Sequence, residues 1–361
     1  MIKINVNNDC VARAYIDAHN NLRDNIKFYE TDDKLVELEC GPGDIGFFDH
    51  LAAGFRYDAL HHVPEKTVVV YVEGLHHIVP YVDHIPTDKR YIFMCHNQWD
   101  WQQYQFPFEY TVIECNFHFW DRLFTHFNLY NFNFFTPLHY DFDCNKPYHF
   151  YAPVGLKRFP RDVIVEKLQS LTYKNYILRY QGYDLGATGY QRLQVEAMRD
   201  QDHFGSWQSF AGFEKHYVSL SEMIPLQTMN QSRLTLPVET QITYPHSFFY
   251  TEKTIKCLIT GAPFVCYSNQ NHMKNLRERL GFETYRDLWD ESYDDILDHE
   301  QRGQAIVDLL ESLKNFDWQA AKSELLRIKH HNMYNVFRLR DRERQVFVQN
   351  SNRIKEFLGR E

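Results

Sequence analysis

PVETQITYPHSFFYTEKTIKCLITGAPFVCY, residues 237–267, decides the fold of this chain. The pattern predicts a strand that ends at Glu239, a loop, a helix that Thr251 caps, and a second strand at 264–267. A strand, a crossing helix and a further strand are the unit from which parallel sheets are built. This stretch therefore predicts an α/β fold.

Charged residues gather where this helix begins. Thr251-Glu252-Lys253-Thr254 forms the first turn, and Glu239 stands thirteen positions before Glu252, across a loop long enough to bring both carboxylates to one cleft edge. The free N–H groups of a helix start and roughly +0.5 charge of its dipole favour an anion. A nucleotide-sugar site needs a carboxylate for the ribose hydroxyls and positive charge for the departing diphosphate. The pattern therefore predicts such a site here.

The same stretch resembles the donor-binding segment of GT-B glycosyltransferases, and most of all that of α-1,3-fucosyltransferase-like enzymes. In those enzymes a strand-ending Glu, a loop and a Thr-Glu-Lys precede a helix and a strand. Together with LRERLGF at 276–282 and DESYD at 290–294, it is also similar to phage-encoded glycosyltransferase-like proteins. The resemblance covers about the last third of the chain.

The resemblance implies two Rossmann-like domains that face a cleft. It implies metal-independent transfer of a hexosyl or pentosyl group from a nucleotide-diphosphate donor, without a cofactor, to the hydroxyl of a glycan or of a hydroxymethylated base in phage DNA. Lys253 would stabilise the leaving diphosphate, and Arg158 is a looser match to a second phosphate ligand. The implied donor-binding positions are Glu239, Thr240, Thr251, Glu252, Lys253 and Thr254.

The first half of the chain reads as an open parallel sheet. Short apolar runs predict strands at Thr67–Val72, Tyr91–Cys95 and Thr111–Cys115, and the stretch 36–55 predicts a strand followed by a helix from Ile45. Open α/β sheets bind ligands beyond the carboxyl ends of their strands. The candidates for a general base on the acceptor hydroxyl are therefore Glu73, His96 and Glu114.

Domain boundaries follow from an aromatic, proline-broken stretch at 140–153, which reads as a linker. The predicted domains are an acceptor-side α/β domain at 1–150 and a nucleotide-sugar-binding α/β domain at 151–330. A helical tail at 331–361 is expected to pack back on the first domain.

Charge and cysteine content narrow the class of partner. The formal net charge of -9 disfavours a surface that holds nucleic acid by counterion release, although a local basic rim is compatible with it. Seven cysteines without a C-x-x-C pair fit the reduced thiols of a cytoplasm, the host's if the chain is viral. No apolar run reaches the ~18 residues that span a bilayer. The sequence leaves the oligomeric state open.

Other interpretations stay open. Asp141-Phe142-Asp143 has the DxD form with which GT-A glycosyltransferases hold a divalent metal. The acidic run at 290–295 lacks the spacing of a calcium loop and predicts a solvated turn. Adjacent histidines such as His61-His62 lack the spacing of a metal site. A non-catalytic binding or assembly protein with a GT-B-like fold is the alternative from a different class.

Overall fold

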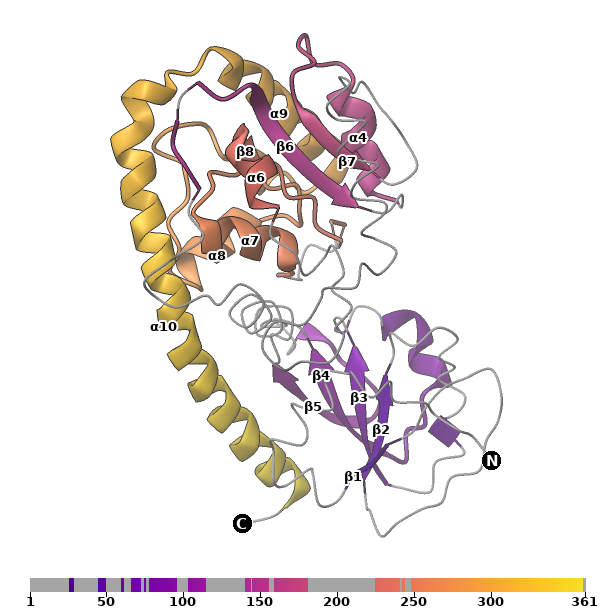
Figure 1. The fold of residues 1–361 in the computed structure, drawn as a ribbon. Helices are drawn as coiled ribbons and strands as arrows, with labels where there is room; N and C mark the ends of the chain where they lie inside the picture. The colour runs from indigo at the N-terminus through magenta and orange to yellow at the C-terminus, as the bar shows by residue number, and fades with distance from the viewer. Residues whose placement is uncertain are drawn as a thin grey trace, which may run out of the picture. The chain divides into compact units, whose positions relative to one another are not determined.

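The computed structural model contains two compact units, Met1–Phe117 with Asp341–Glu361, and His118–Arg340. Each unit contains a parallel sheet together with helices, so the predicted α/β class is confirmed (Figure 1). The structure describes residues 26–28, 45–49, 60–61, 66–72, 75, 78–95, 103–114, 140–143, 145–155, 159–180, 225–240, 242–243 and 248–359.

The first unit is built on a five-stranded sheet in which the strand order follows the chain (Figure 1). Every neighbouring pair is parallel. The three strands predicted at 67–72, 91–95 and 111–115 are confirmed to within about two residues. The strands are β1 (Ile26–Phe28), β2 (Ile45–Asp49), β3 (Thr67–Val72), β4 (Arg90–Cys95) and β5 (Glu109–Glu114).

The stretch at 45–49 does not form the helix that the sequence predicts from Ile45. IGFFD forms β2 and not the start of a helix, and it pairs with Ile26–Phe28 on one side and Thr67–Tyr71 on the other. Periodicity alone does not distinguish a strand from a buried helix in a short apolar run. Pairing with the neighbouring strands determines that these residues form a strand. The strand expected at 36–40 lies outside the described residues.

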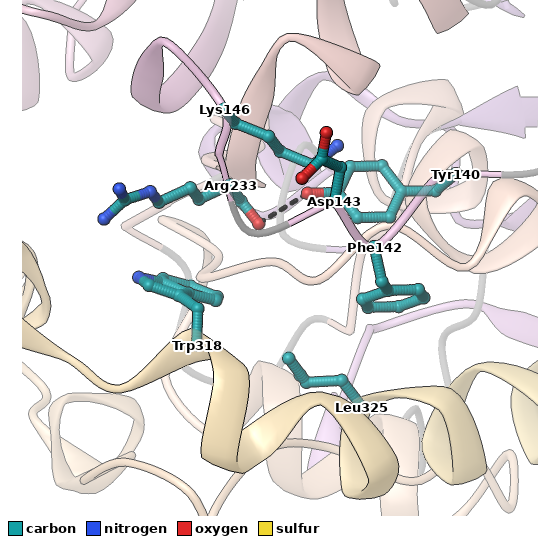
Figure 2. A pocket seen from close by; sticks show the side chains of 7 residues that line it. All are labelled: Tyr140, Phe142, Asp143, Lys146, Arg233, Trp318 and Leu325. Carbon is teal, nitrogen blue, oxygen red and sulfur yellow. Dashed lines mark hydrogen bonds between the residues drawn. The ribbon is translucent and has the colours of Figure 1, made fainter.

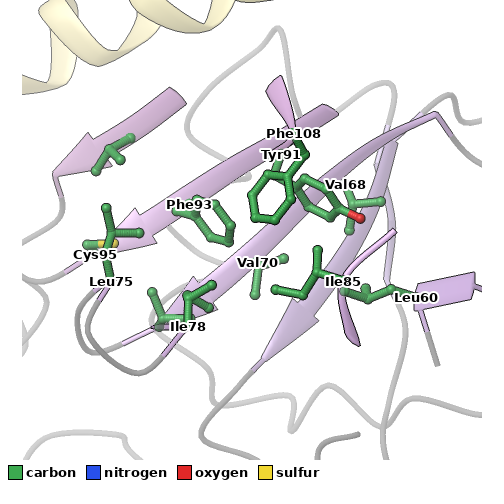
Figure 3. Packing of buried hydrophobic residues seen from close by; sticks show 12 residues of the cluster. Leu60, Val68, Val70, Leu75, Ile78, Ile85, Tyr91, Phe93, Cys95 and Phe108 are labelled. Carbon is green, nitrogen blue, oxygen red and sulfur yellow. The ribbon is translucent and has the colours of Figure 1, made fainter. Parts of the chain in front are cut away.

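Alternate residues of β3 and β4 form an apolar core on one face of this sheet (Figure 3). Val68 pairs with Tyr91 and Val70 pairs with Phe93, and all four are fully buried. The Tyr91 and Phe93 rings stack with their centroids 5.8 Å apart. The cluster comprises Leu60, Val68, Val70, Val72, Leu75, Ile78, Ile85, Tyr91, Phe93, Cys95, Phe108 and Val112.

The last part of α10 (Trp318–Leu358) belongs to the first unit. Asn350 Nδ2 donates to the carbonyl oxygen of Glu114 at 2.6 Å, and Arg353 Nη1 donates to that of Val112 at 2.6 Å. Both acceptors belong to β5, so the helix is hydrogen-bonded to this strand. The expectation that a C-terminal helix packs back on the first domain is confirmed.

The second unit is built on a parallel sheet in which β6 lies between β7 and β8 (Figure 1). Parallel bridges from Thr235 to Phe264 and from Val238 to Tyr267 add the segment 264–267 beside β8. The predicted strand before Glu239 and the predicted segment at 264–267 are therefore confirmed. The strands are β6 (Tyr148–Gly155), β7 (Ile177–Tyr180) and β8 (Ser232–Thr235).

Helices connect and cover these strands. One helix joins β6 to β7, and another joins β8 to the segment 264–267. The sequence predicts the second of these connections. Among the described residues, the α-helices of this unit besides α10 are α4 (Arg161–Leu168), α6 (Leu226–Asn230), α7 (Glu252–Thr260), α8 (His272–Glu278) and α9 (His299–Ser312). Short 3₁₀ helices are η3 (Val79–His84) in the first unit, and η5 (Ser292–Asp295) and η6 (Leu313–Asn315) in the second.

The division between the units differs from the predicted boundaries. The Tyr140 hydroxyl donates to the carbonyl oxygens of Ser232 and Arg233, at 2.6 and 2.7 Å. The expected linker at 140–153 thus bonds to β8 and continues into β6, so the units divide near residue 117. The predicted tail starts inside α10, which runs unbroken through residue 331.

Candidate functional site

Strand order identifies one edge of the second sheet as a place for a ligand. The chain passes from β6 to β7 on one side and then returns to β8 on the other side of β6. In open parallel sheets, ligands bind beyond the carboxyl ends of the strands where the order reverses. We call this place, beyond Gly155 of β6 and Val238 after β8, the carboxyl edge.

Glu239 follows β8 at the carboxyl edge and is fully buried. Its Oε1 accepts hydrogen bonds from the backbone N–H of Thr251 at 3.0 Å, from that of Thr254 at 3.4 Å, and from the Thr254 hydroxyl at 2.6 Å. Its Oε2 accepts from the Thr251 hydroxyl at 2.5 Å. The carboxylate therefore joins the end of β8 to the first turn of α7.

This arrangement changes how the start of α7 is understood. The sequence assigned its free N–H groups to a diphosphate, but the anion bonded to the amides of Thr251 and Thr254 is the Glu239 carboxylate. Thr251 is the N-cap, as predicted, and its hydroxyl accepts from the Lys253 N–H at 3.4 Å. Both oxygens of Glu239 thus already accept hydrogen bonds from the start of α7.

Glu252 and Lys253 form an ion pair beside this cap. Lys253 Nζ lies 2.9 Å from Glu252 Oε1, and the two side chains are 11% and 14% exposed. Lys253 Nζ also donates to the Thr251 hydroxyl at 3.4 Å. Both side chains keep some contact with solvent, so a polyvalent anion can reach the ammonium, where it would replace the Glu252 carboxylate as the partner. Lys253 is thus the predicted site residue best suited to contact a diphosphate.

Arg161 is a residue of the carboxyl edge for which the sequence assigned no role. It is the first residue of α4 and is 3% exposed. Its Nε donates to the carbonyl oxygen of Glu239 at 3.4 Å, and its Nη2 donates to the Thr240 hydroxyl at 2.5 Å. A Cβ atom on Gly155 would lie 3.4 Å from its Nη1, so the guanidinium passes close to the end of β6. Its position at a helix start after a strand was the available signal.

His272 and Arg302 are further buried groups of this unit. His272 is fully buried, and neither ring nitrogen has a hydrogen-bond partner among the described residues. Burial lowers its pKa from 6.5 to about 4, against the opposing charge of Glu239. Arg302 is 1% exposed and donates to the carbonyl oxygens of Ile242 at 2.6 Å and Leu297 at 3.1 Å. A neutral histidine and an arginine whose terminal nitrogens bond to backbone carbonyls thus lie in the interior.

The acidic run at 290–295 differs from the solvated turn that the sequence predicts. Asp294 is 3% exposed and accepts hydrogen bonds from the backbone N–H groups of Met273 and Lys274, at 2.9 and 2.8 Å. Burial raises its pKa from 3.8 to about 6. Glu291, 8% exposed, pairs with Arg277 at 2.6 Å. The expected solvated turn is therefore wrong for these two carboxylates, which hold α8 and its neighbouring loop.

Three predicted site residues, Glu73, His96 and Arg158, lie outside the described residues. The backbone carbonyl oxygen of Glu114, the third candidate for a general base, accepts from Asn350. Among the residues that the structure describes, no group of three or more His, Cys, Asp or Glu side chains could hold a metal ion. The structure thus brings together Glu239, Thr240, Thr251, Glu252, Lys253 and Thr254.

Asp143 of the DxD sequence borders a small pocket of the second unit (Figure 2). The Tyr140 hydroxyl donates to the carbonyl oxygen of Arg233 there. Within the described part of the chain, Arg233 Nε and Trp318 Nε1 have no hydrogen-bond partner. The space is on the order of one water molecule, so a nucleotide sugar does not fit. The lining residues are Tyr140, Phe142, Asp143, Lys146, Arg233, Trp318 and Leu325.

Comparison with known proteins does not assign the chain to a family. No protein-family model matches the chain, and no curated protein is significantly similar to it. Among the described residues, no helix has the length and apolar character to cross a membrane. The functional argument therefore rests on the carboxyl edge.

Proposed function

We propose that the second unit binds a nucleotide-diphosphate sugar at the carboxyl edge and that the protein transfers the sugar to an acceptor hydroxyl. The observation that carries the proposal is the reversal of strand order at β6, because Arg161, Glu239 and residues 251–254 lie at the strand ends where such a sheet is expected to bind a ligand. The resemblance of residues 237–267 to a donor-binding segment supports the same place.

Each residue then has a role that its surroundings allow. Lys253 leaves Glu252 and stabilises the negative charge that develops on the departing diphosphate. Glu252, so released, accepts hydrogen bonds from the ribose hydroxyls. Arg161 holds the Thr240 hydroxyl at the rim of the crevice, and Glu239 fixes the first turn of α7 and with it Lys253.

The resemblance to GT-B glycosyltransferases extends the proposal to the first unit. The resemblance implies two Rossmann-like domains, the first of them for the acceptor, and a reaction without metal or cofactor. The described strands of the first sheet keep the order of the chain, so the acceptor role of the first unit rests on the resemblance alone. Glu73 and His96 stay the candidates for the base that removes the acceptor proton. The acceptor is a glycan or a hydroxymethylated base of phage DNA, in a cytoplasmic setting.

A thermal-unfolding panel tests the donor site. UDP, GDP, dTDP, ADP, CMP and their common sugars are added to the wild type, to Lys253→Ala and to Lys174→Ala, with and without a chelator. Lys174 is the matched control, because it is exposed and precedes β7 at the opposite edge of the sheet. One nucleotide family at 100 times its Kd should stabilise the wild type and the control by about 2.7 kcal/mol. Lys253→Ala should lose most of this, and the chelator should have no effect.

Absence of any nucleotide-dependent shift in the wild type contradicts the proposal. It also favours the non-catalytic alternative, to which one observation lends weight: the carboxylate of Glu239 already occupies the anion-binding start of α7. Turnover separates the two when a donor does bind. A glycosyltransferase hydrolyses or transfers the bound sugar, and a binding module returns it intact.

A further inference from the structure

Phe159 is a large apolar side chain that the fold leaves in water. It lies between β6 and α4, two residues before Arg161, and is 69% exposed. Single exposed apolar residues are common on protein surfaces, so exposure alone carries no meaning. The position of Phe159 is informative, because this residue follows the end of β6 at the carboxyl edge.

The Phe159 ring is held from one side. It contacts the His299 ring edge to face, with centroids 5.4 Å apart and planes at 85°. His299 begins α9, and its carbonyl oxygen accepts from the Tyr267 hydroxyl at 3.0 Å, at the end of the segment 264–267. The ring is therefore supported by the first residue of α9, which is bonded to the end of the segment 264–267, and most of the ring surface stays open.

The donor proposed above has a second part that still lacks a site. Its diphosphate is charged and suits Lys253, whereas its base is a flat aromatic ring that stacks on another aromatic ring. Among the described residues of the second unit, the aromatic side chains that are largely exposed are Phe159 and Tyr334, and Tyr334 lies on α10. Phe159 is the one beside the strand ends.

We propose that Phe159 is the platform on which the nucleobase of the donor stacks. The inference rests on the proposed donor site and names the residue that holds the base. Stacking tolerates any base, because every base has a π face. Phe159 thus supplies affinity for the nucleoside part, and groups that hydrogen-bond the base edge supply the choice among bases.

The test is calorimetric titration of the full chain with UDP, GDP, dTDP, ADP and inorganic pyrophosphate. The variants are Phe159→Ala, Phe159→Tyr, and Tyr334→Ala as the matched control on α10. Phe159→Ala should weaken the nucleoside diphosphate that binds by between about fivefold and a hundredfold, the range expected for one stacked base. Phe159→Tyr keeps the ring and should stay within about threefold of the wild type. Tyr334→Ala should change nothing, and pyrophosphate should bind equally to all four proteins.

Two outcomes overturn the stacking role and leave the donor site standing. In the first, Phe159→Ala binds the nucleoside diphosphate as the wild type does. In the second, Phe159→Ala loses pyrophosphate as well, which means that the ring positions Arg161 and does not stack a base. If neither nucleoside diphosphates nor pyrophosphate bind the wild type, the donor proposal fails and the role of Phe159 falls with it.

Discussion

The two parallel sheets differ in strand order and in what lies beyond their strands. In the first unit the order β1-β2-β3-β4-β5 follows the chain without reversal among the described strands, and a Rossmann-like sheet would reverse. In the second unit the order reverses at β6. Apolar strands of similar composition thus form one sheet whose described strands keep the order of the chain and one whose order reverses.

The two units also differ in what they bury. The core around β3 and β4 is made of valine, isoleucine, leucine, cysteine and aromatic side chains. The interior of the second unit contains Glu239, Arg161, His272, Asp294 and Arg302 at 3% exposure or less. Burial of such groups is costly unless they are paired or hydrogen-bonded, and all but His272 have partners among the described residues. Among the described residues, the most deeply buried charged groups thus lie in the second unit.

Removing the carboxylate of Glu239 should give the largest effect. Glu239→Ala leaves up to four donor groups of Thr251 and Thr254 unsatisfied, so we expect the free energy of unfolding of the second unit to fall by about 4 kcal/mol. Chemical denaturation measures it. Glu166→Ala, which removes an exposed carboxylate from α4, should be nearly neutral. Equal stability of the two variants would mean that Glu239 does not anchor α7.

His272 predicts a pH dependence that belongs to the second unit. An unfolded histidine binds a proton below about pH 6.5, whereas buried His272 does so only near its pKa of about 4. The folded state therefore binds fewer protons between these values. The contribution of His272 to the free energy of unfolding should fall by about 3 kcal/mol as pH drops from about 6.5 to about 4.

The comparison of His272→Leu with the wild type isolates this contribution. Asp294 acts in the opposite direction, since its pKa is raised to about 6 and its protonation favours the folded state as pH falls towards 4. It titrates in both proteins, so the difference between them reports His272. His330→Gln, on the exposed side of α10, is the control and should follow the wild type. Parallel pH profiles for the wild type and His272→Leu would contradict the burial of a neutral ring.

The sequence predicted local structure better than it predicted the site. Strands such as Thr67–Val72 were predictable because apolar, β-branched runs mark buried parallel strands. β2 was not, because its identity depends on pairing with strands far along the chain. The cap between Glu239 and Thr251 was missed for the same kind of reason, since it depends on how the intervening loop folds. Strand order, which places the carboxyl edge, is not written in any single segment.

The smallest effect concerns a surface ion pair, and it sharpens the contrast with the buried carboxylates. Arg327 on α10 lies 2.5 Å from Glu283 and 2.7 Å from Glu324, but its side chain is 53% exposed. Water and salt screen such pairs, so Arg327→Ala should cost less than about 1 kcal/mol and less still in 1 M salt. Denaturation at two salt concentrations measures both. A loss comparable with that of Glu239→Ala would show that α10 depends on this pair, and that charge stabilises the second unit at its surface as strongly as beside its strand ends.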